Sequence, residues 1–151
     1  IREIIPDATI TTDIIAGFCS ETLEDHQMTL SLMEEAKFDY AFMFQYSQRP
    51  NTKAARHFED DVPLEEKTRR LNEIIDLQNR LSHESNKKDV GKVFEVLIEG
   101  TSKKNKNELF GRTPGNKVCV FPACGHKAGD YVHVLVESCT SATLIGKITN
   151  K

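Results

Sequence analysis

The sequence predicts an α/β unit of order strand–helix–strand–helix, followed by a small antiparallel β-barrel of the oligonucleotide-binding type. Apolar residues follow mixed strand and helix periods up to about residue 88, whereas a period of two dominates from residue 90 onward. The net charge changes sign at the same place. Residues 1–89 hold 11 Lys and Arg against 18 Asp and Glu, and residues 90–151 hold 9 against 5. We therefore expect two modules, residues 1–88 and 89–151, of which the second is basic.

The first module begins with a strand, a helix and a second strand. Residues 8–17 are β-branched and apolar almost throughout, which is typical of a strand covered on both faces in a parallel sheet. Thr22, followed three residues later by Asp25, predicts a capping-box start for the helix that follows. Residues 38–46 are apolar and aromatic and predict a second buried strand. This order makes a βαβ unit.

A long helix closes the first module. Residues 53–63 have no clear period and are expected to form an irregular loop ending at Pro63, a residue suited to a helix start. Leu71, Ile74 and Leu81 then recur at helical spacing, which predicts a linking helix over residues 64–86.

The second module contains short segments of alternating polarity, separated by Gly, Asn and Pro clusters. Such even spacing is typical of a small β-barrel. The five expected strands cover residues 90–99, 108–112, 117–121, 131–137 and 142–148.

Composition excludes several protein classes. With 38% hydrophobic and 28% charged residues, the profile is that of a globular domain, and no apolar run is long enough to cross a bilayer. The four cysteines lack a disulfide-scaffold pattern, so we expect free thiols and a cytoplasmic location. Cys119, Cys124 and His126 have a spacing that zinc could use, with Cys139 or His133 as the candidate fourth ligand. Free thiols are the favoured alternative, so no metal site is expected. The chain starts at Ile1 in what resembles a helix end, so we expect it to be a piece of a longer protein.

The end of the second strand is the first candidate site. The strand runs directly into the polar turn at residues 47–52, and ligands of α/β proteins bind at such strand ends. Tyr46 offers a ring for packing near a base, and Arg49 a planar charge for phosphate or ribose. Alternatively, this is an ordinary strand end at which Arg49 pairs with Glu59 or Asp60.

The sequence resembles, over almost its whole length and in the same order, the last part of the radical S-adenosylmethionine methylthiotransferases. The segments that carry this resemblance are Thr11–Phe18, Glu21-Thr22, Tyr46–Ala55, Glu99-Gly100, Ser102–Lys104, Phe110–Thr113, Asn116–Val118 and Leu144–Gly146. The segments up to Ala55 resemble the end of the catalytic barrel of this family. The segments from Glu99 onward resemble its TRAM domain. Arg49-Pro50 is most similar to the branch that modifies an isopentenylated adenosine of tRNA. Two places depart from the family pattern: Cys19-Ser20 stands where Pro-Gly is usual, and Asn51-Thr52-Lys53 where Gly-Thr-Pro is usual.

The resemblance implies a partial TIM-like radical-enzyme barrel followed by a TRAM barrel. It implies S-adenosylmethionine and two 4Fe–4S clusters as cofactors in the intact enzyme. The cluster cysteines are absent from this chain and are expected in upstream portions of the same protein, so the chain alone is expected to be inactive. The implied partner is the anticodon stem-loop of tRNA, with no membrane and a monomeric state.

The resemblance also places the turn at Gly17–Glu21 near the S-adenosylmethionine moiety. Gly17 allows close approach of a ligand, and a helix start favours negative groups. A plain βα turn, with Glu21 as a helix-start carboxylate, is the alternative. Asp13 is expected either to orient a neighbour in the barrel lumen or to be a satisfied buried carboxylate.

For RNA binding, the candidates are basic residues of the second module and one aromatic residue: Lys103, Lys104, Lys106, Arg112, Lys117 and Phe121. Lysines attract phosphates and an exposed Phe stacks a base. The alternatives are a solvated hairpin tip and a Phe121 buried in the core. Three rival functions stay open: a non-catalytic RNA-binding protein, a relative that modifies a ribosomal protein, and a relative that modifies threonylcarbamoyladenosine.

Overall fold

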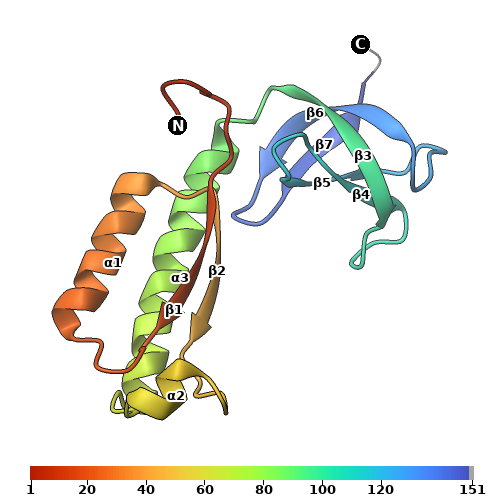
Figure 1. Ribbon diagram of the computed structural model, residues 1–151. Coiled ribbons are helices and arrows are strands. Elements are labelled where there is room, and N and C mark those ends of the chain that lie inside the picture. The colour runs from red at the N-terminus through yellow and green to blue at the C-terminus, as the bar shows by residue number, and fades with distance from the viewer. Residues whose placement is uncertain (150–151) are drawn as a thin grey trace. The chain divides into compact units, whose positions relative to one another are not determined.

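The computed structural model describes residues 1–149, and these form two compact units (Figure 1). One unit comprises residues 10–81, and the other comprises residues 1–9 together with the chain from Ser82 onward. The two final residues of the second predicted module, 150 and 151, lie outside the described part.

The unit of residues 10–81 contains the expected strand–helix–strand–helix order. Its elements are β1 (Thr11–Ala16), α1 (Leu23–Ala36), β2 (Tyr40–Gln45), α2 (Lys53–His57) and most of α3 (Leu64–Lys87). The strands pair in parallel, from Thr11 opposite Tyr40 to Ala16 opposite Gln45. Their carboxyl ends therefore lie at one edge, which places the two predicted candidate turns side by side.

Helix α1 begins as predicted. The Thr22 hydroxyl accepts a hydrogen bond from the backbone N–H of Asp25 (3.1 Å), and the Asp25 carboxylate accepts one from the N–H of Thr22 (2.9 Å). Helix α2 is a correction, since an irregular loop was expected there. Thr52 caps it by accepting from the N–H of Ala55, and two alanines favour the helical turn.

The two strands were expected to be buried on both faces, and this prediction is wrong for the described residues. One face packs on the helices around a core of Ala16, Met33, Ile74 and Leu81. The other face is open: Ile15, Phe42 and Phe44 are each more than half exposed. The apolar composition suited burial on both faces, but the described residues cover only one.

The second unit is a closed barrel in the strand order β3-β4-β5-β7-β6. The strands are β3 (Val93–Thr101), β4 (Glu108–Arg112), β5 (Val118–Pro122), β6 (Tyr131–Cys139) and β7 (Leu144–Ile148). All neighbours are antiparallel except β5 and β7, whose parallel pairing closes the barrel. Closure leaves no free sheet edge among these strands. At one crossing the backbones come so close that a Cβ on Gly111 would lie 2.1 Å from the Leu97 carbonyl oxygen.

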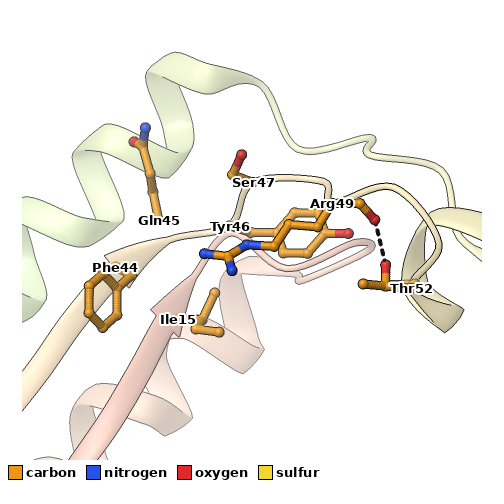
Figure 2. A pocket seen from close by; sticks show the side chains of 8 residues that line it. Ile15, Phe44, Gln45, Tyr46, Ser47, Arg49 and Thr52 are labelled. Carbon is orange, nitrogen blue, oxygen red and sulfur yellow. Dashed lines mark hydrogen bonds between the residues drawn. The ribbon is translucent and has the colours of Figure 1, made fainter.

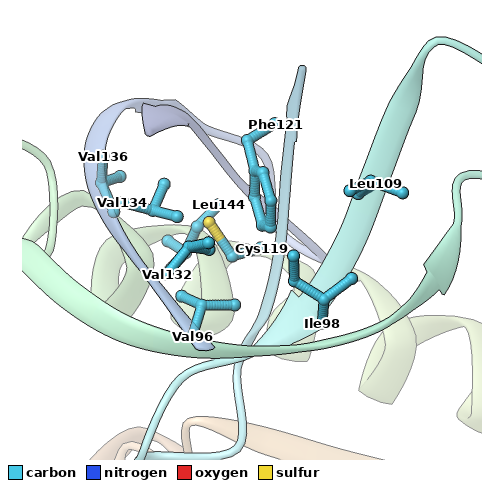
Figure 3. Packing of buried hydrophobic residues seen from close by; sticks show 9 residues of the cluster. All are labelled: Val96, Ile98, Leu109, Cys119, Phe121, Val132, Val134, Val136 and Leu144. Atoms are coloured by element: carbon cyan, nitrogen blue, oxygen red, sulfur yellow. The ribbon is translucent and has the colours of Figure 1, made fainter. Parts of the chain in front are cut away.

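Phe121, a candidate for base stacking, and Cys119, a candidate metal ligand, are both buried in the barrel core. Figure 3 shows Phe121 and Cys119 among the valines and leucines of the interior, and both are at most 1% exposed. Burial raises the pKa of the Cys119 thiol to about 12. Phe121 therefore belongs to the core, and Cys119 is separated from the exposed Cys124.

Candidate functional site

The candidate site in the first unit lies where β1 and β2 end. The N–H of Tyr46 donates to the carbonyl of Ala16 (2.8 Å), so the pairing continues one residue past the strands. Beyond it, residues 17–22 lead into α1 and residues 46–52 lead into α2.

The turn after β1 is closed by its own carboxylate. Glu21 accepts hydrogen bonds from the N–H groups of Gly17 (2.7 Å) and Phe18 (3.2 Å) through Oε2. Its Oε1 lies 2.9 Å from Nη1 of Arg70, a buried residue of α3. The Glu21 carboxylate thus shapes the backbone and is neutralised within the unit.

Two residues that depart from the family pattern adopt the backbone geometry that a glycine would favour. Ser20 has φ +63° and Asn51 has φ +68°, both in the left-handed region. Ser20 is held there by Asp61, which accepts from its N–H (2.6 Å) and its hydroxyl (3.1 Å). The backbone N–H of Ser20 lowers the pKa of Asp61.

A buried lysine that was not predicted from the sequence contacts both of these turns. Lys67 on α3 is 5% exposed, and its Nζ bonds to Asp60 and lies 5.2 Å from the centre of the Tyr46 ring. A Cβ on Gly17, whose φ is +72°, would lie 2.3 Å from Lys67 Cγ. Lys67 and Arg70 are in helical phase with Ile74, and this would have indicated their burial.

Tyr46 is half-buried and Phe18 meets its ring edge-on at 5.0 Å. The Cys19 thiol beside the hydroxyl, followed by burial, raises the pKa of Tyr46. The raised pKa disfavours the phenolate, so the Tyr46 ring offers a neutral packing surface.

A cavity of about 470 Å³ lies at the strand ends beside Tyr46. Figure 2 shows the side chains that line it. The residues that line it are Ile15, Phe44, Gln45, Tyr46, Ser47, Arg49, Thr52 and Ala54. In Figure 2 the Arg49 guanidinium reaches back toward the strand ends, whereas the Arg49 carbonyl accepts from the Thr52 hydroxyl (2.9 Å). Asp60 is occupied by Lys67, and Arg49 forms no ion pair within residues 1–149. Aromatic walls with one unpaired guanidinium suit a flat, anionic ligand such as a nucleotide.

Asp13 lies away from this cavity. It is exposed on the open face of β1, opposite Phe42 in the register, and its neighbour on that face toward the strand end is Ile15. The structure thus brings Tyr46 and Arg49 together at the cavity. Gly17 and Glu21 lie in the turn between β1 and α1 and are not among the residues that line the cavity.

In the barrel unit, the predicted basic residues separate into two groups. Lys103, Lys104 and Lys106 are exposed in the turn between β3 and β4. Lys117 instead bonds to Asp89 (2.6 Å) and Ser85 (2.9 Å), and its side chain is 17% exposed. The Lys117 charge is therefore used inside this unit.

Arg112 is intermediate between these groups. Its Nε lies 3.2 Å from Glu99, and its Nη1 donates to the carbonyl oxygen of Asn116 (3.0 Å). These contacts orient the guanidinium but leave the side chain 42% exposed.

No group of three His, Cys, Asp or Glu residues that could hold a metal ion occurs within residues 1–149. Over the same residues, none of the helices is both long and apolar enough to cross a membrane.

Comparisons with known proteins match nearly the whole chain. It is 60% identical over 147 residues to a tRNA-2-methylthio-N(6)-dimethylallyladenosine synthase from Phocaeicola vulgatus. It is 57% identical over 148 residues to the protein of the same name from Porphyromonas gingivalis, and 58% identical over 147 residues to that from Bacteroides thetaiotaomicron. These matches cover 97%, 98% and 97% of the chain and 32% of each relative. The chain thus spans about a third of the length of the curated relatives it matches. The TRAM domain model matches residues 87–149.

Proposed function

We propose that the chain is the C-terminal part of a tRNA methylthiotransferase, because almost all of it is similar to tRNA-2-methylthio-N(6)-dimethylallyladenosine synthases and its residues 87–149 match the TRAM domain model. The intact enzyme would add sulfur and a methyl group to an isopentenylated adenosine next to the tRNA anticodon. The observation that carries the proposal is 60% identity extending over 97% of the chain, across both units.

The implied iron–sulfur clusters do not fit the residues of this chain. Cluster iron is held by cysteine thiolates, but Cys19 and Cys119 are buried, and residues 1–149 contain no group of three His, Cys, Asp or Glu residues that could hold a metal ion. We propose that the two 4Fe–4S clusters and most of the S-adenosylmethionine site belong to upstream portions of the same protein. No chemical step is assigned to this chain.

The unit of residues 10–81 would supply the last part of the radical-enzyme barrel. Its open strand face and the cavity at the strand ends support this role, because a barrel encloses its ligands at the carboxyl ends of its strands. Tyr46 would pack near the adenine, and Arg49 would contact phosphate or ribose. Gly17 and Glu21 would shape the wall, since the Glu21 carboxylate already has its partners. Asp13 would face the lumen.

The barrel unit would bind the tRNA. Its segment of the chain is net basic, and Lys103, Lys104 and Lys106 project from one turn. Exposed lysines provide sequence-independent attraction to phosphates. We further propose a monomer in the cytoplasm.

Gel-shift competition with the 151-residue chain tests the RNA assignment. A labelled tRNA anticodon stem-loop should bind, and unlabelled stem-loop should displace it better than unrelated RNA of equal length. Equal displacement by any RNA would favour a non-catalytic RNA-binding protein. Tight binding of an isolated ribosomal protein, with no preference for the stem-loop, would favour the ribosomal-protein-modifying relative.

Sequencing the coding DNA upstream of Ile1 tests the enzymatic assignment. We expect a Cys-x3-Cys-x2-Cys motif and three further cysteines closer to the start. An open reading frame without them would contradict the proposed radical chemistry.

A further inference from the structure

Tyr131, the first residue of β6, is the most exposed aromatic side chain of residues 1–149, at 65%. Its ring makes no aromatic contact with the other rings of the described chain. An exposed tyrosine at the start of a barrel strand contributes nothing to the core, so its ring is free to meet another flat surface.

The neighbours of Tyr131 extend this surface in a row across three strands. Leu97 on β3 is paired with Tyr131 on one side and with Arg112 of β4 on the other. Leu97 is itself 37% exposed and forms an apolar floor next to the ring. Glu99 and Asn116 orient the Arg112 guanidinium at the far end of the row. A ring, an apolar floor and an oriented guanidinium form a platform suited to an unpaired base and its phosphate.

Backbone hydrogen bonds bring two loops to the same end of the barrel as Tyr131. The N–H of Ala123 donates to the carbonyl of Asn107 (3.0 Å), which joins the β5–β6 loop to the β3–β4 turn. The N–H of Gly129 donates to the carbonyl of Ile98 (2.8 Å), so the end of that loop lies against β3 beside Leu97.

These loops concentrate positive charge at that end. Their exposed cations are Lys103, Lys104, Lys106 and Lys127. Two of the nearby acids have partners of their own: Asp130 accepts from the backbone N–H of Lys127 (3.0 Å), and Glu99 lies against Arg112. Glu108, at the start of β4, leaves the four lysines in excess. The net positive charge complements a polyanion, which distinguishes this surface from the open apolar face of the other unit.

We propose that Tyr131 stacks an unpaired RNA base at the rim of this end of the barrel, while the β3–β4 turn and the β5–β6 loop hold the adjoining phosphates. The proposal rests on the proposed function for its ligand, because the chain must bind tRNA at all. It goes further by assigning the stacking residue and by adding the β5–β6 loop to the interface.

Fluorescence anisotropy with the full 151-residue chain and a labelled anticodon stem-loop tests this. Tyr131→Ala should weaken binding roughly 5-fold to 150-fold, the range that loss of one base–aromatic stack produces, with the salt dependence unchanged. Tyr131→Phe should bind like the wild type, because the ring suffices. Tyr40→Ala, which removes an exposed tyrosine of the other unit, should also bind like the wild type. A fully paired RNA of equal length should not distinguish Tyr131→Ala from the wild type.

Tyrosine fluorescence provides a readout of stacking itself, because the chain has three tyrosines and no tryptophan. Stem-loop RNA should quench the wild-type emission, and the share of this quenching that comes from Tyr131 should be lost in Tyr131→Phe, although that variant still binds. Tyr40→Phe should retain it.

The outcomes separate the two proposals. If the wild-type chain binds the stem-loop and Tyr131→Ala binds equally well, or if Tyr131→Phe keeps the full quenching, the stacking role is wrong while tRNA binding stands. If the wild-type chain binds no RNA, both proposals fall.

Discussion

The Nζ of Lys67 lies 5.2 Å from the centre of the Tyr46 ring while it is ion-paired with Asp60. This relationship ties three segments together: helix α3, the end of β2 and the loop before Pro63. A cation above a tyrosine ring in a half-buried setting is stabilising, and the Asp60 carboxylate compensates the buried charge. Lys67 therefore stabilises the position of Tyr46 in the cavity wall, although Lys67 itself does not line the cavity.

Lys67→Met should destabilise the unit of residues 10–81 by about 1–3 kcal/mol, because Asp60 loses its partner and the cation–π contact is removed. Urea unfolding followed by helical circular dichroism measures this. Arg80→Met is the matched control on the same helix, since its pair with Glu34 is half exposed on both sides and such pairs contribute under about 1 kcal/mol. Equal losses in the two variants would contradict a structural role for Lys67.

Gly17→Ala should lower the stability of the fold more than alanine does at another glycine whose backbone lies in the left-handed region. Gly17 has φ +72° and Gly125 has φ +82°. At either position an alanine would adopt a strained backbone conformation, which costs about 1 kcal/mol. Only Gly17 also meets a side chain, since its Cβ would lie 2.3 Å from Lys67 Cγ, whereas Gly125 has nothing within 4 Å. We expect a larger fall in melting temperature for Gly17→Ala than for Gly125→Ala. A smaller fall would show that Lys67 moves aside freely.

Acid should weaken the helical unit through Glu66. Hydrogen bonds from Arg69 and then Arg70 lower the pKa of Glu66 from 4.5 to about 2. A carboxylate with a depressed folded-state pKa contributes stability above its unfolded pKa and loses that contribution as pH falls toward the folded value. The urea midpoint should therefore decline between about pH 4.5 and pH 2.

Glu66→Gln should reduce this decline, because glutamine does not titrate. Glu65→Gln, an exposed neighbour on the same helix, is the control and should leave the pH dependence as in the wild type. A Glu66→Gln profile that overlays the wild-type profile would exclude Glu66 as a source of acid sensitivity.

Lys103→Glu and Lys104→Glu should each weaken tRNA binding and flatten its dependence on salt. Each phosphate contact that is lost should reduce the slope of log affinity against log salt by about 1. The measurement is stem-loop affinity at several salt concentrations. Lys37→Glu carries the same charge reversal in the other unit and should keep the wild-type slope. Unchanged slopes for both variants would remove the β3–β4 turn from the interface.

Lys117→Met should act on stability rather than on RNA binding. Lys117 bonds to Asp89 and Ser85, and both members of the ion pair are mostly buried. Loss of this pair should cost the barrel unit about 1–3 kcal/mol, measured by thermal unfolding. Stem-loop affinity at a temperature where the variant is folded should match the wild type. A tenfold loss of affinity without a change in stability would return Lys117 to the RNA interface, as expected from sequence.

The sequence by itself determined the elements that depend on local interactions. The capping box of Thr22 and Asp25, the long helix after Pro63 and the alternating strands after residue 92 all depend on residues near one another in the chain. Helix α2 was missed because five residues are too few to establish a period. The resemblance to the methylthiotransferases was likewise readable from short motifs, and the comparisons confirm it.

Only the tertiary structure decided which partner each polar group has. Glu21 turns back onto Gly17 and Arg70, Lys67 reaches Asp60, and Lys117 reaches Asp89 across 28 positions of sequence. From residue type and spacing alone, each of these polar side chains could contact solvent, bind a ligand or form an ion pair. Burial and distance select among these, and both arise only when segments distant in sequence pack together. For the same physical reason, Phe121 lies in the core while Tyr131 lies at the surface, although both belong to strands of one barrel.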